Sequence, residues 1–344
     1  MSEKTTFLLD KHLTQKPQIN LARSTVSRMW LMNICAFMAI FQSSMTDSYS
    51  SMLIALAAVF SAVLTEYLII NRGRGARTLL DGSAVASALI LTLLLPNRIS
   101  PIYAAAGAVF AIAVIKHSFG GLGSNWLNPA AGGWLFVRFS WPGQFKQALE
   151  GSLLSGSPFG GAGNLFAATM PPDNSLRSFL NSNIFSLTGV QLPGGYIDLF
   201  TSHFPGIIAD RGVFALLLGT IIITAFRVNR SWIPLVYLLV FGFLVRMAGA
   251  LPYGDVLWNG DVIFSICTGG TLVAAFFLAA DPASGSKSNL GILIAVIAAG
   301  ALAFSFRFFG YEPYGAVLSL LLINAILPLL RALENRLLYK KAGD

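Results

Sequence analysis

A glycine- and asparagine-rich stretch interrupts an apolar part of the chain. After the run IYAAAGAVFAIAVIKHSF, the sequence continues GGLGSNWLNPAAGGWLFV, which contains Gly120, Gly121, Gly123, Asn125 and Asn128. Such residues are poor helix formers in water. Inside a bilayer, unwound backbone must be buried in protein or line a cavity, because exposed N–H and C=O groups are costly there. Broken membrane helices often supply binding groups. The stretch therefore predicts a binding site within a membrane-embedded helix bundle.

Ionisable side chains within or beside apolar runs are the second set of candidates, since burying them in a membrane is expensive. Asp81 opens one apolar run and Asp281 closes another, while Glu66 and Lys116 lie near the ends of two more. Helix capping or interfacial snorkelling explains Asp81 and Asp281 equally well, so both interpretations stay open.

Composition indicates what kind of scaffold holds these residues. The chain of 344 residues is 55% hydrophobic and only 11% charged, which is typical of an all-α polytopic membrane protein. Runs long enough to span a bilayer predict about ten transmembrane helices, at 29–45, 52–72, 79–96, 101–117, 128–141, 212–226, 233–250, 262–280, 290–306 and 314–333. Cys35 and Cys267 both fall inside these spans, so we expect neither a disulfide framework nor a metal site.

The distribution of Lys and Arg predicts the orientation. Basic residues precede the first span and follow the second, sixth and tenth, whereas residues 46–51 and 251–261 contain none. By the positive-inside rule both termini are cytoplasmic. The net charge of +8 is then explained by membrane topology and lipid, and no nucleic-acid partner is expected. The resulting division is a cytoplasmic segment 1–28, a first transmembrane half 29–141, an extracytoplasmic loop 142–211, a second half 212–333 and a cytoplasmic tail 334–344.

The two halves show similar patterns. DGSAVASALILTLLLP and FGGLGSNWLNPAAGGWLFV in the first half match DVIFSICTGGTLVAAFFLAADP and FRFFGYEPYGAVLSLLLINAILP in the second, each pair separated by one helix. This favours a 5+5 internal repeat with broken helices and a site where the halves meet. Glycine-rich membrane helices can also look alike by composition alone, so that alternative stays open.

The strings LLDGSAVASALILTLLLP, KHSFGGLGSNWLNPA, TGGTLVAAFFLAADPASGS and FGYEPYGAVLSLLLINAILPLL together resemble the RnfD/NqrB family, over about residues 17 to 335. The length is closer to RnfD than to NqrB. The resemblance implies a ten-helix fold related to urea transporters, a location in the bacterial cytoplasmic (inner) membrane, and a flavin near the extracytoplasmic side. It also implies an ion-translocating oxidoreductase complex whose partner subunits carry iron–sulfur clusters and further flavins.

The same resemblance implies an FMN joined through its phosphate to a threonine by a flavin transferase. Thr169, in FAATMPP of the long loop, keeps the Ala-Thr pair of the family motif, although Phe166 and Ala167 depart from it. Thr188, in SLTG, is the second candidate. Thr271, in TGGT, lies inside the predicted eighth span, out of reach of a transferase, but its hydroxyl could line the core.

Several further residues are candidates for contact with a flavin, whether the FMN or a second, non-covalent flavin such as riboflavin. A flavin ring presents several donors and acceptors at its edge, and the candidate partners are Asp81, Lys116, Gly120, Gly121, Gly123, Asn125, Asn128, Thr271 and Asp281. Trp126 could pack on a ring face or anchor the membrane interface. We assign no catalytic residue and no metal ligand. A solute channel or transporter of the urea-transporter-like fold is the alternative function.

Overall fold

The computed structural model describes residues 25–46, 50–70, 80–121, 123, 125, 127–154, 199–200, 206–253, 257–258, 260–281, 288–310 and 312–342. All regular elements in these ranges are helices. We call the end of the bundle where α2 begins the first end, and the end where α2 stops the second end.

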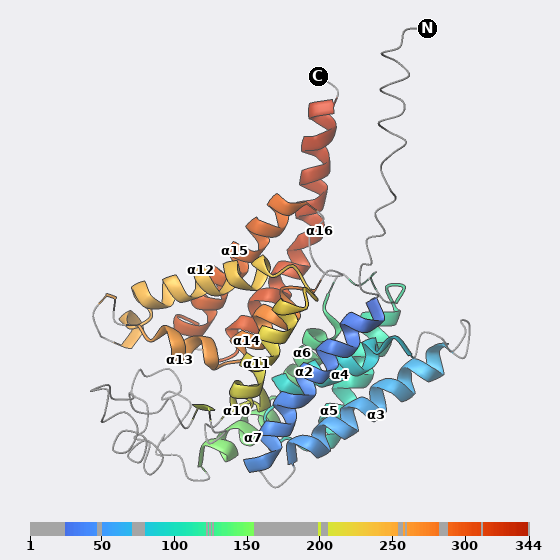
Figure 1. The fold of residues 1–344 in the computed structure, drawn as a ribbon. Coiled ribbons are helices and arrows are strands. Elements are labelled where there is room, and N and C mark those ends of the chain that lie inside the picture. Colours follow the sequence, from blue (N-terminus) through green and yellow to red (C-terminus); the bar gives the residue numbers. More distant parts are fainter. Residues whose placement is uncertain are drawn as a thin grey trace, which may run out of the picture.

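The helices of the first half lie together on one side of the molecule (Figure 1). They are α2 (Thr25–Thr46), α3 (Ser50–Ile70), α4 (Ser83–Leu94), α5 (Pro101–Phe110), the π-helix η2 (Ala111–His117), α6 (Pro129–Ser140) and α7 (Pro142–Leu154). α3 packs on α4 and α5, and α6 packs on α5 and η2. Small residues such as Ala58, Ala62 and Ala104 are fully buried, which lets these backbones approach closely.

The second half forms the other side (Figure 1). It comprises α10 (Ile208–Arg211), α11 (Val213–Ala225), α12 (Trp232–Ala248), the 3₁₀-helix η5 (Leu251–Tyr253), α13 (Val262–Cys267), α14 (Thr271–Val273), the π-helix η6 (Ala274–Leu278), α15 (Asn289–Phe308) and α16 (Gly315–Ala342). α15 packs on α12 and α16. The halves are joined where α11 packs on α2, α10 and α14 on α4, and α16 on α6.

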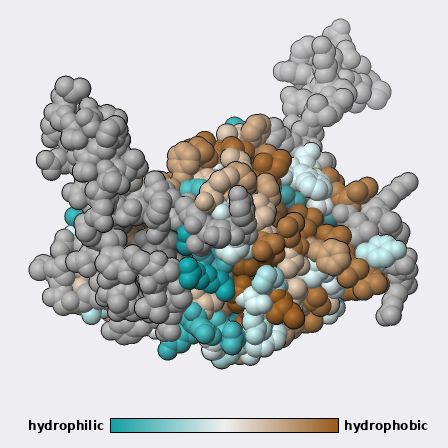
Figure 2. Space-filling view, turned by 90° about the horizontal axis from the view of Figure 1, so that it is seen from below, coloured by the Kyte–Doolittle hydropathy of each residue, from teal (hydrophilic) through white to brown (hydrophobic). Residues whose placement is uncertain are grey.

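The outer surface of the bundle is apolar. Large hydrophobic side chains on the two longest strongly apolar helices are exposed, including Leu56 and Phe60 on α3 and Leu290 on α15. Figure 2 shows a wide hydrophobic area on the described surface, with a smaller hydrophilic area beside it. Among the described residues, α3 and α15 are each long and apolar enough to cross a bilayer, and five shorter apolar helices accompany them. Exposed apolar area on this scale is typical of contact with lipid, as expected of an integral membrane protein.

Most predicted spans correspond to observed helices. The fourth (101–117) is Pro101–His117, continuous through α5 and η2, and the fifth (128–141) is α6. The predicted eighth span (262–280) is wrong as one continuous helix, because α13 ends at Cys267 and α14 begins at Thr271. Gly269 and Gly270 have φ of 66° and 67°, a left-handed conformation that glycine adopts readily and that interrupts a helix.

Candidate functional site

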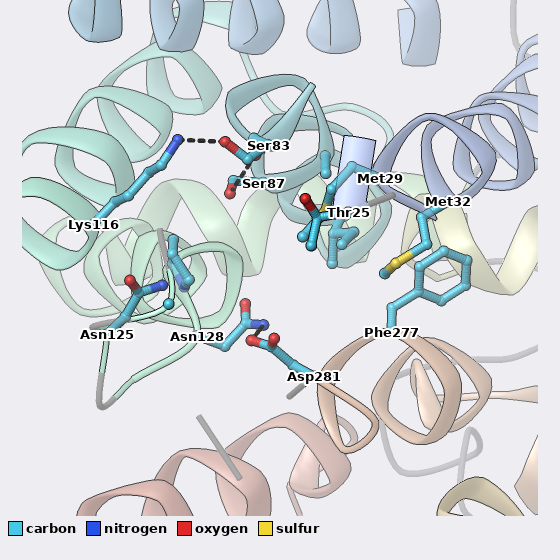
Figure 3. A pocket seen from close by; sticks show the side chains of 14 residues that line it. Thr25, Met29, Met32, Ser83, Ser87, Lys116, Asn125, Asn128, Phe277 and Asp281 are labelled. Carbon is cyan, nitrogen blue, oxygen red and sulfur yellow. Dashed lines mark hydrogen bonds between the residues drawn. The ribbon is translucent and has the colours of Figure 1, made fainter. Parts of the chain in front are cut away.

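A cavity of about 270 Å³ lies at the first end of the bundle, where the start of α2 meets the broken stretch after η2 (Figure 3). It is lined by Thr25, Met29, Met32, Ser83, Ala86, Ser87, Ile90, Lys116, Gly123, Asn125, Asn128, Pro129, Phe277 and Asp281. The lining comes from both halves, since Phe277 lies on η6 and Asp281 follows it. The volume of the cavity is close to the lower limit of the usual range for small-ligand sites, which is roughly 300–1,000 Å³.

The broken stretch owes its shape to three glycines. Gly120, Gly121 and Gly123 have φ of 107°, 92° and 87°, values that side-chain-bearing residues rarely adopt. A Cβ placed on Gly121 or Gly123 would meet no atom within 4 Å. These glycines are therefore required by backbone conformation, and crowding by protein atoms does not explain them. Of the three, Gly123 lines the cavity.

Asn128 ends the broken stretch and starts α6. Its Oδ1 accepts hydrogen bonds from the backbone N–H groups of Ala130 (3.0 Å) and Ala131 (3.4 Å), while Pro129 occupies the first helical position. This is a side-chain N-cap with proline where its missing N–H does no harm. The Asn128 Nδ2 donates to Asp281 Oδ2 at 2.9 Å. One amide thus caps a helix of the first half and holds a carboxylate of the second.

Asn125 offers the cavity an unused acceptor. The residue is 5% exposed, and its Oδ1 has no hydrogen-bond partner among the described residues. A buried amide oxygen without a partner is costly, and ligand donors commonly satisfy such groups.

Lys116 sits on the cavity wall inside a network that sequence analysis did not predict. Its Nζ pairs with Glu66 Oε1 at 2.5 Å and donates to Ser83 Oγ at 2.6 Å. Ser83 Oγ in turn donates to Asp81 Oδ1 at 2.6 Å, and the Ser83 backbone N–H donates to the same oxygen at 2.7 Å. Lys116 and Glu66 are only 2% and 1% exposed. The charges of this buried pair therefore balance each other beside the cavity.

The network distinguishes the roles of the predicted residues. Asp81 is not among the residues that line the cavity, and its Oδ1 accepts the first backbone N–H of α4, that of Ser83, while Gly82 is the N-cap residue. Lys116, Gly123, Asn125, Asn128 and Asp281 come together at the cavity. Gly120 and Gly121 turn the chain just before it, with the Gly120 and Gly121 N–H groups bonded to the His117 and Lys116 carbonyls.

Thr271 belongs to a different cluster, at the second helix break. Its hydroxyl donates to the carbonyl of Thr268 (2.9 Å) or Ser265 (3.2 Å), and the residue is fully buried. Arg307 of α15 fills this break: Nη1 donates to the Ser265 and Thr268 carbonyls at 2.7 and 2.9 Å, and Nη2 to Thr268 Oγ1. The Gly270 N–H donates to Asp210 Oδ1 at 3.1 Å.

The sequence analysis did not predict Arg307 or Asp210 as site residues, although the sequence contains a signal for Arg307. Arg307 is a cation near the end of an apolar span, just as Lys116 is in the first half. Lys116 bonds the hydroxyl of Ser83 at the start of α4, the preceding apolar helix. Arg307 likewise bonds the hydroxyl of Thr268 at the break in the apolar segment that precedes α15. Comparing the two halves position by position would have pointed to Arg307.

The candidate attachment residues Thr169 and Thr188 lie outside the described residues, as does Trp126. The chain leaves the described region after α7 and returns at Leu199 and Phe200, where the Gln42 Nε2 donates to the Phe200 carbonyl at 2.9 Å. Gln42 is near the end of α2, at the second end of the bundle. The loop that carries both threonines is therefore attached at the end opposite the cavity. Within the described ranges, no group of three or more His, Cys, Asp or Glu side chains could hold a metal ion.

Comparison with known proteins finds relatives that match most of this chain. The D-subunit of the proton-translocating ferredoxin:NAD(+) oxidoreductase complex of Clostridium ljungdahlii is 28% identical over 92% of this chain and 92% of that protein. The D-subunit of the Na(+)-translocating ferredoxin:NAD(+) oxidoreductase complex of Acetobacterium woodii is 28% identical over 96% of each chain. The D-subunit of an ion-translocating oxidoreductase complex of Stutzerimonas stutzeri is 31% identical over 82% of this chain and 81% of that protein.

A family model describes the same relationship without reference to any single relative. The model named NQR2, RnfD, RnfE family matches residues 12–340, a range that includes the cavity, the second helix break and the loop between the halves. The chain therefore belongs to the NQR2, RnfD, RnfE family.

Proposed function

We propose that this protein is the membrane-embedded D-subunit of an Rnf-type ion-translocating ferredoxin:NAD⁺ oxidoreductase complex. The observation that carries the proposal is the family match over residues 12–340, together with relatives that cover nearly the full chain and are named as the D-subunits of such complexes. The chain acts as one part of that enzyme. Its partners in this proposal are the other subunits, which carry iron–sulfur clusters and further flavins.

The cavity at the first end is the proposed site of a non-covalent flavin, such as riboflavin. It combines an apolar wall of Met29, Met32 and Phe277 with polar groups at separate points, namely Lys116, Asn125 and Asp281. A ring with donors and acceptors on its edge fits this arrangement, because the Asn125 Oδ1 lacks a partner among the described residues and Lys116 can face a negative charge. A flavin bound there would supply one- and two-electron transfer.

The protein groups around the cavity would orient such a ring and tune its charge. Lys116 would stabilise electron density on the ring, since a cation close to a buried group favours its anionic form. Asn125 would accept a hydrogen bond. Asn128 and Asp281 would fix the spacing between the halves, since their hydrogen bond crosses from α6 to the end of η6.

A covalent FMN on Thr169, attached by a flavin transferase, is proposed as a second cofactor. Because the loop 142–211 is attached at the second end of the bundle, this FMN would lie on the side opposite the cavity. α6, with 12 residues, separates the two ends by about 18 Å at 1.5 Å per residue. We therefore propose that the tethered flavin docks near the second break, around Thr268 to Thr271.

Orientation and coupling complete the proposal. The start of α2 and the end of α16 lie toward the same side in Figure 1, which supports an even number of spans, and the basic termini then face the cytoplasm. The two halves each contain a broken stretch and a buried cation near the end of the equivalent helix, which supports the 5+5 repeat of a urea-transporter-like fold. Because one relative belongs to a complex named as proton-translocating and another to one named as Na⁺-translocating, either ion is compatible with this chain.

Flavin analysis of the chain, expressed with its complex and flavin transferase, tests this function. We expect in-gel flavin fluorescence and one FMN adduct by intact mass, lost in Thr169→Ala and kept in Thr188→Ala and Thr271→Ala. Acid extraction should release a second, non-covalent flavin. An adduct that survives Thr169→Ala but not Thr188→Ala moves the attachment to Thr188. A complex in which this chain holds no flavin of either kind would contradict the flavin assignment and favour the channel or transporter alternative.

A further inference from the structure

The buried carboxylate of Glu66 lies beside the cavity, and its partner cation, Lys116, also lines the cavity. Glu66 is 1% exposed; its Oε1 pairs with Lys116 Nζ, and its Oε2 has no hydrogen-bond partner among the described residues. Within the described part of the chain, the charged or titratable groups that face it are Lys116 and His117 at the end of η2, with Asp81 connected through Ser83. Lys116 is the close partner that balances its charge.

The same ammonium also faces the cavity. Lys116 lines the cavity wall, and Figure 3 shows its side chain reaching from η2 toward Ser83 of α4. Lysine carries its charge on a flexible four-carbon stem, so a small rotation changes which anion it approaches. Negative charge that enters the cavity therefore competes with Glu66 for this cation.

The carboxylate cannot remain charged and unpaired when that competition succeeds. An isolated buried carboxylate is so unfavourable that such groups take up a proton instead. A route for the proton exists at His117, whose Nε2 lies 3.6 Å from Glu66 Oε1 and whose side chain is 17% exposed, against 2% for that of Glu66. His117 is thus the more solvent-accessible neighbour of a carboxylate sealed from water.

We propose that Glu66 is a proton-uptake site that Lys116 links to the charge in the cavity, with His117 as the entry point; this rests on flavin binding in the cavity as proposed above. When an external reductant adds negative charge to the cavity, the Lys116 ammonium turns toward it. Glu66 then gains one proton from water through His117, forming a single O–H bond. On reoxidation the ammonium returns to Glu66 and the proton leaves by the same route. One proton is taken up for each negative charge that Lys116 compensates.

Redox-difference infrared spectroscopy of the purified complex, reduced with dithionite, tests this link directly. In the wild type we expect a protonated-carboxyl C=O band that appears on reduction and shifts in D₂O. Glu66→Gln should lose it while retaining the cavity flavin. Lys116→Met should also lose it, and Lys116→Arg should keep it because the charge is preserved. Glu312→Gln is the matched control, since Glu312 pairs with Arg138 away from the cavity and should leave the band unchanged.

The pH dependence of the midpoint potential of the non-covalent flavin gives an independent readout. One extra proton per two electrons adds about 30 mV per pH unit to the slope, by the two-electron Nernst factor for a tenfold change in concentration. Glu66→Gln should lower the wild-type slope by this amount. His117→Phe should slow proton uptake after a reductant pulse without altering the slope.

The outcomes separate this inference from the function it rests on. A complex without the non-covalent flavin overturns the cofactor assignment and this inference with it. If the flavin is present but the wild type shows no carboxyl band, or Glu66→Gln keeps the wild-type band and slope, proton uptake at Glu66 is wrong and flavin binding stands. A band that survives Lys116→Met overturns the role of Lys116 as the link.

Discussion

Asn128 joins the two halves at the cavity, and its substitution tests that arrangement quantitatively. Its Oδ1 caps α6 through the Ala130 and Ala131 N–H groups, and its Nδ2 holds Asp281. Loss of an N-cap costs about 1 kcal/mol. A hydrogen bond to a charged group is worth about 1.5–3 kcal/mol in soluble proteins, but only about 0.6 on average between membrane helices. Asp281 is partly exposed, so we take about 1 kcal/mol for this bond.

These values give distinct expectations for two variants. Asn128→Ala loses both interactions and should destabilise the protein by about 2 kcal/mol, whereas Asn128→Ser keeps a cap acceptor and should lose about 1 kcal/mol. Equilibrium unfolding by SDS titration in mixed micelles measures both. A double-mutant cycle of Asn128→Ala with Asp281→Ala should then give a coupling of about 1 kcal/mol. The reasoning is refuted if Asn128→Ala changes the unfolding free energy by less than about 0.5 kcal/mol, the range typical of surface substitutions.

Other substitutions test the second break, the glycine conformations and the topology. Arg307→Met removes the donor to four carbonyl and hydroxyl acceptors of the second break, so it should cost about 2 kcal/mol at about 0.6 for each bond. The cavity flavin content of the complex should stay at the wild-type level, and unchanged SDS unfolding would contradict the prediction. Gly121→Ala should be as harmful as Gly121→Leu, about 1–2 kcal/mol, since the positive φ is the obstacle and the space at Cβ is open; a much larger effect of leucine would point instead to crowding. Reporters fused after residue 344 and inserted at 46–51 should be labelled from opposite sides of the membrane, and labelling from one side would exclude an even number of spans.

Hydropathy predicted most of the helices, because an apolar run within lipid must form the hydrogen bonds of its backbone N–H and C=O groups inside the protein, as a helix does. It placed the fourth span correctly at 101–117 and the fifth within a residue at each end. It could not find the break at Thr268–Gly270, since apolar residues on both sides keep the average high and two glycines are common in membrane helices.

The site was predictable only as a set of residue types. The glycines and asparagines of the first break indicated an unwound backbone, and these residues lie at or next to the cavity. The pairing of Glu66 with Lys116 joins residues 50 positions apart, and the contact of Asn128 with Asp281 joins residues 153 apart. Such pairs depend on how the helices pack, which local sequence patterns do not specify.

The two π-helical segments make the geometry of the cavity sensitive to how these helices wind. η2 carries Lys116 and η6 carries Phe277, so both cavity walls depend on a turn that holds one residue more than an α-helical turn. If the same residues of Ala111–His117 wound as a regular α-helix instead, everything beyond would rotate by about 100°, the angle per residue of a 3.6-residue turn. Lys116 would then point away from Glu66, although the amino acids forming the cavity would be unchanged. In this protein the charge balance of the site thus depends on the π-helical winding of η2 as much as on the residues themselves.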